Sequence, residues 1–326
     1  MGNMRMVGRI TPGPCVITWC RHHHHHRGIH VCGLARDELN SGIATFYDQS
    51  TGLWEDMWGD HLHHGYYGGG TNASAKTSDG GRRSNRQAQI DMIEEVLSWA
   101  GVERVEHMVD VGCGLGGSSR HIAEKYGCDA RGITLSPYQA TRGNEISESV
   151  GLGDRVSLQV ADALDQPFED DSFDLVWSLE SGEHMPDKER FVKELVRVAM
   201  PGGRVIIVTW CHRVVEDGSG LTVEEKALLD DICDAYYLPA WCSVERYREL
   251  FEENGMEDIK IADWSEEVSP FWGEVIKSAL SVKGVVGLLK AGWMTLKGAL
   301  VMPLMAKGLQ QGLVKFVLIT GTKRNE

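Results

Sequence analysis

Residues 108–118 read Met-Val-Asp-Val-Gly-Cys-Gly-Leu-Gly-Gly-Ser and give the strongest indication of the fold. A short apolar strand ends near Asp110, and Gly112, Gly114 and Gly116 follow at alternate positions before a predicted helix. Glycines in such a loop allow positive φ angles and let a ligand approach the backbone closely. The pattern therefore predicts a nucleoside-binding loop after a strand of an α/β domain.

Short apolar strands alternate with longer helices on both sides of this loop. The predicted strands cover residues 105–111, 128–135, 155–160, 173–179, 204–210, 258–262 and 315–320. The predicted helices cover residues 86–99, 118–126, 137–150, 188–199, 223–235 and 244–254. This alternation predicts a Rossmann-like α/β fold, with a seven-stranded, mostly parallel sheet, helices on both faces and a C-terminal helical cap.

The composition is that of a globular protein with an acidic balance. The chain has 326 residues, of which 42% are hydrophobic and 25% charged, and its formal net charge is −14. An acidic protein is poorly suited to bind a nucleic-acid duplex, because phosphate binding needs a basic face. We therefore expect no nucleic-acid partner. The eight cysteines show no C-x-x-C spacing, and no metal site is predicted.

The two ends of the chain differ from its middle. Residues 1–44 are predicted to be a disordered or targeting segment, because the first 36 residues contain five Arg and no acid. Residues 45–326 are predicted to form the folded domain. Within it, residues 268–312 are predicted to form an amphipathic helical cap that is inserted before the last strand.

The predicted cap carries regularly spaced cations. Lys283, Lys290 and Lys297 are seven residues apart, which places them on one face of a helix. A basic amphipathic helix can pack on the domain with its lysines in solvent, or it can lie on a membrane surface or a lipid substrate. Peripheral membrane contact through residues 271–302 is therefore one of two expectations for this segment.

The acid beside the glycine loop discriminates between two nucleotide ligands. A dinucleotide-binding loop receives a pyrophosphate, and an acid about 20 residues later normally binds the ribose. Here Thr134 stands where that acid would be, and Asp110 adjoins the loop. A carboxylate at this place disfavours a pyrophosphate and suits a ligand that carries an ammonium and a sulfonium. The loop therefore indicates S-adenosylmethionine rather than NAD.

Two later positions support this cofactor. Asp162 follows the third predicted strand, where a carboxylate can accept a hydrogen bond from the adenine amino group. Ser178 lies in the fourth strand, which opens towards the transfer site. The cofactor contacts expected from the loop and these strands are Asp110, Gly112, Cys113, Gly114, Gly116, Asp162, Ala163 and Ser178.

The chain resembles class I methyltransferases and, among them, the γ-tocopherol C-methyltransferase family of plants and algae. The resemblance covers about residues 45–323 and rests on the stretches 46–66, 108–117, 160–168, 179–187, 195–204, 269–272 and 301–305. Family members are similar to this chain in the Thr-Leu-Ser…Gln pattern after the second strand. The resemblance implies that Thr134, Leu135 and Gln139 contact the ribose or the adenosine.

The resemblance also implies a function. It is the S-adenosylmethionine-dependent C-methylation of a phenolic chromanol ring, which converts γ- or δ-tocopherol to α- or β-tocopherol. The implied substrate is a small lipophilic phenol, and the implied location is the chloroplast, at the envelope or the plastoglobule surface. Related N-methyltransferases of indole alkaloid pathways share motifs with this chain, so methylation of a small-molecule nitrogen is the alternative.

Two other classes predict different sequence features. An NAD-dependent oxidoreductase would place an acid at Thr134, and a catalytically silent lipid-binding module would have a damaged glycine loop. Neither feature is present.

A catalytic base is expected near the end of the fourth strand. Methylation of a ring carbon requires removal of the ring proton, for which an imidazole is suited near neutral pH. His184 is the first candidate, and Glu180 is expected to orient it or the phenol. His64 and His63, in the aromatic-rich stretch 46–66, are second candidates.

Overall fold

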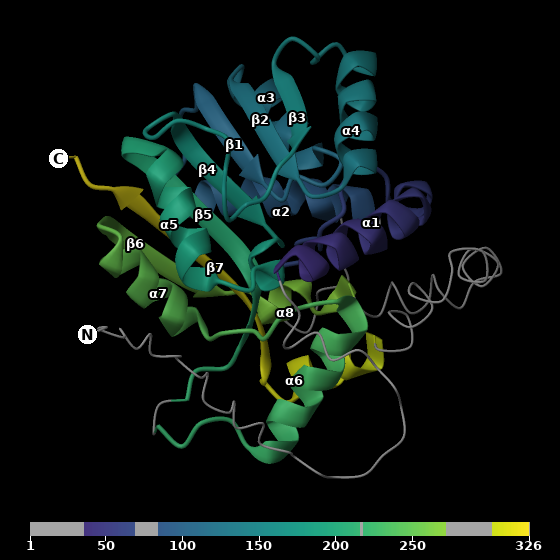
Figure 1. Ribbon diagram of the computed structural model, residues 1–326, viewed down its shortest axis with the longest axis vertical. Coiled ribbons are helices and arrows are strands. Elements are labelled where there is room, and N and C mark those ends of the chain that lie inside the picture. Colours follow the sequence, from purple (N-terminus) through teal and green to yellow (C-terminus); the bar gives the residue numbers. More distant parts are fainter. Residues whose placement is uncertain (1–35, 69–83, 216–217, 272–301, 326) are drawn as a thin grey trace, which may run out of the picture.

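One central sheet organises the protein in the computed structural model, which describes residues 36–68, 84–215, 218–271 and 302–325 (Figure 1). The strands are β1 (His107–Val111), β2 (Asp129–Thr134), β3 (Val156–Val160), β4 (Phe173–Leu179), β5 (Ala199–His212), β6 (Met256–Asp263) and β7 (Val314–Lys323). They form one seven-stranded sheet in the order β3-β2-β1-β4-β5-β7-β6. Strands β1 to β5 pair in parallel, and β7 lies antiparallel between β5 and β6. The predicted Rossmann-like, mostly parallel sheet is confirmed.

Helices cover both faces of this sheet (Figure 1). They are α1 (Arg36–Trp58), α2 (Asn85–Ala100), α3 (Gly117–Tyr126), α4 (Pro137–Ser149), α5 (Lys188–Val198), α6 (Val223–Tyr236), α7 (Val244–Glu253) and α8 (Ser265–Val268), with a 3-10 helix η1 (Gly182–His184). Side chains alternate along the strands, as the pleat requires. Met108 packs into the core that contains α2 and α3, whereas its neighbour Val109 packs into the core that contains α5 and α7.

The start of α4 follows directly from its sequence. Ser136 caps the helix, since its Oγ accepts a hydrogen bond from the Gln139 backbone N–H at 3.0 Å, and Pro137 occupies the first helical position. This cap fixes the turn after β2 and brings Gln139 to the carboxyl edge of the sheet.

Strand β5 is longer than predicted. Phe173 pairs with Ala199, but Leu175 pairs with Arg204, so the partner strand contains extra residues at this place. Gly202 lies inside this bulge with a φ of 75°. The sequence suggested a strand that begins after the bulge, because a Pro-Gly-Gly stretch normally ends a strand rather than interrupting it.

Helix α1 begins at Arg36, within the segment 1–44 that the sequence analysis separated from the domain. Leu39 and Ile43 form a small buried cluster on it. The helix is also held by polar pairs, such as Arg142 Nη2 with Glu55 Oε1 at 2.7 Å. A helix that is positioned largely by polar pairs needs no regular spacing of apolar residues. The sequence of α1 therefore lacks the periodicity by which a helix is predicted.

The cap is described only in part. Residues 302–310 are helical, and Met305 packs with Ile232 of α6 and Phe316 of β7 in the same core. The lysine-bearing part of the predicted cap, and with it most of the expected membrane contact at 271–302, lies outside the described residues, as does the terminal segment before Arg36. Among the described helices, none combines the length and the apolar character that crossing a bilayer requires.

Candidate functional site

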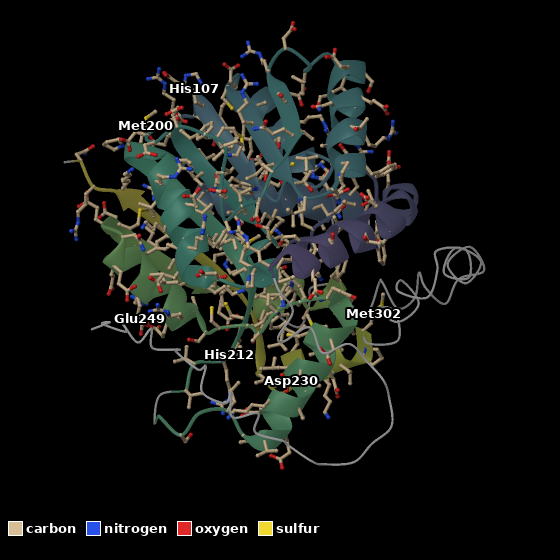
Figure 2. All side chains as sticks on the ribbon, viewed as in Figure 1. His107, Met200, His212, Asp230, Glu249 and Met302 are labelled. Atoms are coloured by element: carbon tan, nitrogen blue, oxygen red, sulfur yellow. The ribbon has the colours of Figure 1, made fainter. Side chains whose placement is uncertain are left out.

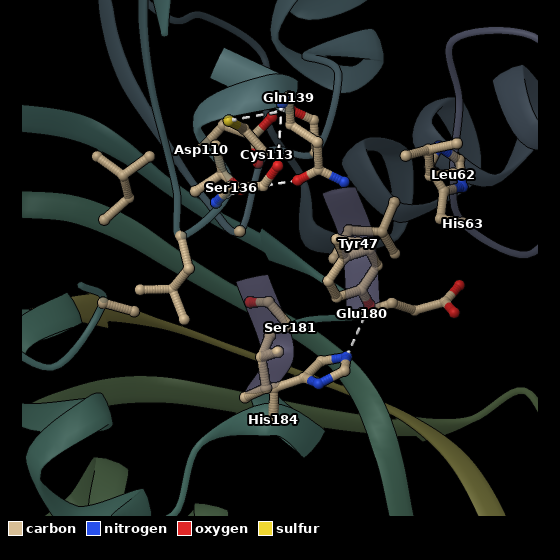
Figure 3. Close-up of a pocket in the computed structure, with 18 of the residues that line it drawn as sticks. Tyr47, Leu62, His63, Asp110, Cys113, Ser136, Gln139, Glu180, Ser181 and His184 are labelled. Atoms are coloured by element: carbon tan, nitrogen blue, oxygen red, sulfur yellow. Dashed lines mark hydrogen bonds between the residues drawn. The ribbon is translucent and has the colours of Figure 1, made fainter. Parts of the chain in front are cut away.

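The candidate site lies at the carboxyl edge of the parallel strands. His107 and Met200, near the amino ends of β1 and β5, lie at one end of the molecule, whereas His212, the last residue of β5, lies towards the opposite end, nearer Asp230 of α6 (Figure 2). A pocket opens at this second edge, and segments that follow β1, β2, β3 and β4 line it together with α1 (Figure 3). Parallel sheets bind ligands at this edge.

The glycine loop forms one wall of the pocket. Gly112 and Gly114 have φ angles of 85° and 54°. A Cβ atom on Gly112 would lie 2.3 Å from the Cβ of Ser181, so no larger residue fits there. The backbone N–H groups of Gly112 and Cys113 donate to the Ile133 carbonyl at 2.9 and 3.0 Å, which ties the loop to the end of β2. The loop thus offers bare backbone to a ligand.

Asp110 provides a buried carboxyl beside this loop. The hydroxyl of Ser119 donates to Asp110 Oδ2 at 2.6 Å. Burial raises the pKa of Asp110 to about 6, although the Ser119 hydrogen bonds and the positive charge of Arg120 oppose that shift. At neutral pH the group is mostly ionised and poorly hydrated. A cationic ligand in the pocket would therefore be attracted to it.

The residues after β2 are joined to each other and to α1. Thr134 Oγ1 donates to Gln139 Oε1 at 2.7 Å, and Gln139 Nε2 donates to Thr51 Oγ1 at 3.1 Å. Thr134, Leu135 and Gln139 all line the pocket, as the family resemblance implied. Their contact with a ribose or adenosine stays a prediction.

Asp162 lines the pocket but is already partnered. Arg36 Nη2 and Asn40 Nδ2 each donate to its Oδ2 at 2.7 Å, and the Leu164 backbone N–H donates to its Oδ1 at 2.8 Å. A carboxylate has about four acceptor positions. Oδ1 can therefore still accept a hydrogen bond from an adenine amino group, which is the predicted role.

Most of the predicted cofactor residues gather at this pocket. Those that line it are Asp110, Gly112, Cys113, Gly114, Thr134, Leu135, Gln139, Asp162 and Ala163. Gly116 and Ser178 are not among the lining residues. A Cβ on Gly116 would lie 2.8 Å from Leu158 Cδ1, which is a packing constraint. Ser178 Oγ is hydrogen-bonded to Ser181 Oγ at 2.7 Å, and Ser181 is the serine that reaches the pocket.

His184, the first candidate base, lies in η1 and lines the pocket. Its Nε2 and the Tyr47 hydroxyl are hydrogen-bonded at 2.9 Å. Burial, together with the charge of Lys188, lowers the pKa of His184 to about 4. The imidazole is therefore neutral at neutral pH and has one nitrogen that can accept a proton.

Glu180 pairs with His64 and not with His184, which was one of the two partners expected for it; the other, the phenol, stays a prediction. The backbone N–H and the Nδ1–H of His64 donate to the two Glu180 oxygens, each at 2.6 Å. Burial alone would raise the pKa of Glu180, but the charge and hydrogen bonds of His64 outweigh it and hold the pKa below its usual range. Glu180 lines the pocket and has a φ of 54°, a strained value for a residue with a side chain.

His64 itself lies behind the pocket wall. Its ring packs against Phe271 and Trp210, with centroid separations of 4.1 and 5.0 Å. It is not among the lining residues, whereas His63 is. The Gln89 amide donates to the carbonyls of His61 and His63 at 2.6 and 2.9 Å, which holds this histidine segment against α2.

Tyr47 is one of the lining residues for which the sequence indicated no role. It is part of the aromatic-rich stretch 46–66, but nothing in that stretch indicates which of its aromatic residues reaches His184, 137 positions away. The resemblance in this stretch was the available signal.

Comparisons with known proteins agree with this geometry. A family model described as a methyltransferase domain matches residues 109–207. The chloroplastic tocopherol O-methyltransferase of Arabidopsis thaliana is 54% identical over 300 residues, covering 90% of this chain and 85% of that protein. Norajmaline N-methyltransferase of Rauvolfia serpentina is 38% identical, covering 88% and 99%. A geranyl diphosphate methyltransferase solved with its substrate and sinefungin has the same fold, with a TM-score of 0.69 at 23% identity over 87% of this chain and 99% of that one.

Proposed function

Because this chain belongs to the tocopherol methyltransferase family of S-adenosylmethionine-dependent enzymes, we propose that it methylates a ring carbon of a chromanol, ortho to the phenol. The acceptors are γ- and δ-tocopherol, which become α- and β-tocopherol. The Arabidopsis relative is named an O-methyltransferase, so the choice of carbon over oxygen is part of the proposal and rests on chemistry. An ortho carbon is nucleophilic because the phenol oxygen donates electron density to it.

One observation carries the proposal: a buried carboxyl and a neutral imidazole face the same pocket. Asp110 suits the cationic end of S-adenosylmethionine, and Gly112, which packs against Ser181, lines the same pocket. Asp162 keeps an acceptor position for the adenine amino group. The residues present therefore fit this cofactor.

The protein acts mainly by positioning its two ligands and by accepting a proton. When bound, S-adenosylmethionine supplies a methyl group on a positively charged sulfur. The glycine loop and Asp110 hold that end of the cofactor, and the wall formed by Glu180 and η1 holds the acceptor ring. Placement of two reactants in contact supplies most of the rate enhancement in such reactions. His184 is the proposed acceptor of the phenol proton of the acceptor ring.

Product analysis with labelled cofactor tests the proposal. The wild-type chain is incubated with methyl-labelled S-adenosylmethionine and, separately, γ-tocopherol, a sterol and an indole alkaloid. We expect label on a ring carbon of γ-tocopherol, identified by NMR of the product, and none with Asp110→Ala. Label on the phenol oxygen would refute carbon methylation, and label only on the alkaloid nitrogen would support the alternative N-methyltransferase.

The compartment and the membrane contact extend the proposal. The Arabidopsis relative is named chloroplastic, and we place this chain in the chloroplast too. Its targeting segment would end before Arg36, because residues 36–44 belong to α1 and contribute to the pocket. A tocopherol is dissolved in lipid, so we further propose that residues 271–302 contact the envelope or the plastoglobule surface.

Flotation with anionic vesicles tests this contact. The wild-type chain is expected to float with the vesicles at low salt, and the chain in which Lys283, Lys290 and Lys297 are changed to Glu is expected not to float. Equal recovery of both chains would contradict the contact.

A further inference from the structure

The two ring nitrogens of His184 have different surroundings. Nε2 faces the Tyr47 hydroxyl at 2.9 Å, and Figure 3 shows this bond as a dashed line between the two side chains. Nδ1 is buried and has no hydrogen-bond partner among the residues that the structure describes. The Tyr47 oxygen therefore offers a direct route by which a proton from a ligand in the pocket can reach His184.

Tyr47 is placed to contact such a ligand. It projects from α1 and lines the same pocket as Asp110 and Gly112. Its ring meets the His184 ring edge-on, with centroids 5.6 Å apart and an interplanar angle of 64°. A hydroxyl has one hydrogen to donate and two lone pairs to accept with. The Tyr47 oxygen can therefore donate to Nε2 and accept a hydrogen bond from a phenol at the same time.

The surrounding charges determine which partner donates. Burial, and the carboxyl groups of Glu183 and Glu180, raise the pKa of Tyr47 well above its usual value. Burial and Lys188 lower the pKa of His184. Both groups are therefore neutral near pH 7, with a phenol O–H that resists ionisation next to an imidazole that retains a free lone pair. This favours Tyr47 as the donor and Nε2 as the acceptor.

We propose that Tyr47 is a catalytic residue whose hydroxyl binds the phenol of the acceptor and relays the phenol proton to Nε2 of His184. This inference rests on the proposed function and deepens it. In this proposal Tyr47, on α1, contacts the phenol directly, and His184 receives the proton from Tyr47.

The relay balances for a ring methylation. The phenol proton passes to the Tyr47 oxygen while the Tyr47 proton passes to Nε2, which leaves a phenolate and an imidazolium. The ortho carbon forms its bond to the methyl group, and the electrons of the broken carbon–sulfur bond stay on sulfur. The ring proton at that carbon then leaves to water, and the imidazolium returns its proton through Tyr47 to the ring oxygen. One proton is released per turnover.

Kinetics of matched variants test the relay. Tyr47→Phe and His184→Asn are each expected to lower kcat about 100-fold with the cofactor Kd within about twofold of wild type. The double variant is expected to be no slower than either single variant, since the two residues act as one unit. Tyr138→Phe, on a tyrosine that is 41% exposed, is the matched control and keeps the wild-type kcat. A Tyr47→Phe chain with wild-type kcat would overturn the inference.

A second readout needs no turnover. In ¹⁵N NMR of the cofactor-free chain, the Nε2 signal of His184, assigned by its loss in His184→Asn, is expected to be that of an unprotonated acceptor. Tyr47→Phe shifts it and Tyr138→Phe does not. A protonated Nε2 in the wild-type chain would refute the relay. These results are separable from the proposed function, which fails instead if wild type does not methylate a chromanol carbon.

Discussion

Gly112 can take its place in the glycine loop only because it has no side chain. An alanine there would have a φ of 85° and would place its Cβ 2.3 Å from that of Ser181. We expect Gly112→Ala to weaken S-adenosylmethionine binding at least about tenfold and to lower the free energy of unfolding by about 2–4 kcal/mol, from backbone strain and overpacking. Titration calorimetry and urea unfolding measure the two effects.

Gly127 provides the control for that change. Its φ is 69°, and a Cβ there would meet nothing within 4 Å. Gly127→Ala is therefore expected to cost only the strain of the left-handed backbone, about 1–2 kcal/mol, and to leave cofactor affinity unchanged. If both variants bound the cofactor like wild type, the loop would not be the cofactor site.

Asp110 is expected to lower the free energy of unfolding while it strengthens binding of S-adenosylmethionine. Its pKa of about 6 in the folded chain exceeds the value of about 3.9 in an unfolded one, so its ionisation costs the folded state about 3 kcal/mol at pH 7.5. Because the folded pKa is the higher one, this cost is absent below about pH 4 and grows as the pH rises to about 6. Asp110→Asn removes it, since a neutral amide does not ionise.

The Asp110→Asn chain should therefore unfold at higher urea than wild type at pH 7.5, with a smaller gain at pH 5. Its affinity for the cofactor should fall at least about tenfold at pH 7.5, and wild-type affinity should fall between pH 7.5 and 5 as the carboxyl is protonated. Urea titrations and calorimetry at both pH values check this. A variant that binds normally would show that Asp110 does not hold the cationic ligand.

At the scale of residues, the sequence predicts features formed by residues that are close together in the chain. Asp110 and Gly112 could be assigned because the loop, the preceding strand and the following helix are contiguous. The bonds of His64 to Glu180 and of Tyr47 to His184 join residues 116 and 137 positions apart. No periodicity or spacing encodes such pairs, so the partner of Glu180 could not be identified from the sequence and Tyr47 was given no role.

Helix α1 forms one side of the pocket and is held there by polar pairs. Arg36 binds Asp162, Asp48 accepts from the Ser136 hydroxyl, and Glu55 binds Arg142. We expect a chain that begins at Thr45 to bind S-adenosylmethionine at least about tenfold more weakly than one that begins at Arg36, because it lacks the residues that contact Asp162. Calorimetry on the two chains measures this, and equal affinities would mean that the start of α1 is dispensable.

At the scale of elements, the strands were the most predictable. β4 runs from Phe173 to Leu179 as expected, because a buried parallel strand is a continuous apolar run between turns. β5 extends beyond its predicted ends, since the bulge at Gly202 keeps it in the sheet. α1 could not be predicted because polar pairs with α4 and the pocket largely position it.

The whole molecule is expected to respond to a ligand in this pocket. The pocket joins α1 to segments that follow four strands, so a bound ligand stabilises contacts across much of the domain. A ligand at 100 times its Kd stabilises the native state by about 2.7 kcal/mol. S-adenosylhomocysteine at 100 times its wild-type Kd should raise the Tm of wild type by about 5 °C and that of Gly112→Ala by at most about half as much. A scanning calorimeter records both, and an equal rise in the two chains would place the ligand elsewhere.

The position of β7 has a consequence for biosynthesis. Nine residues of β7 pair with β5 and six with β6, so it joins two strands that precede it in the chain. A ribosome finishes β5 and β6 before it makes the strand that belongs between them. Until residues 314–323 emerge, the nascent polypeptide exposes an unpaired apolar edge on β5, which is a template for association with other chains. We therefore expect molecular chaperones that shield this edge to raise the yield of folded enzyme.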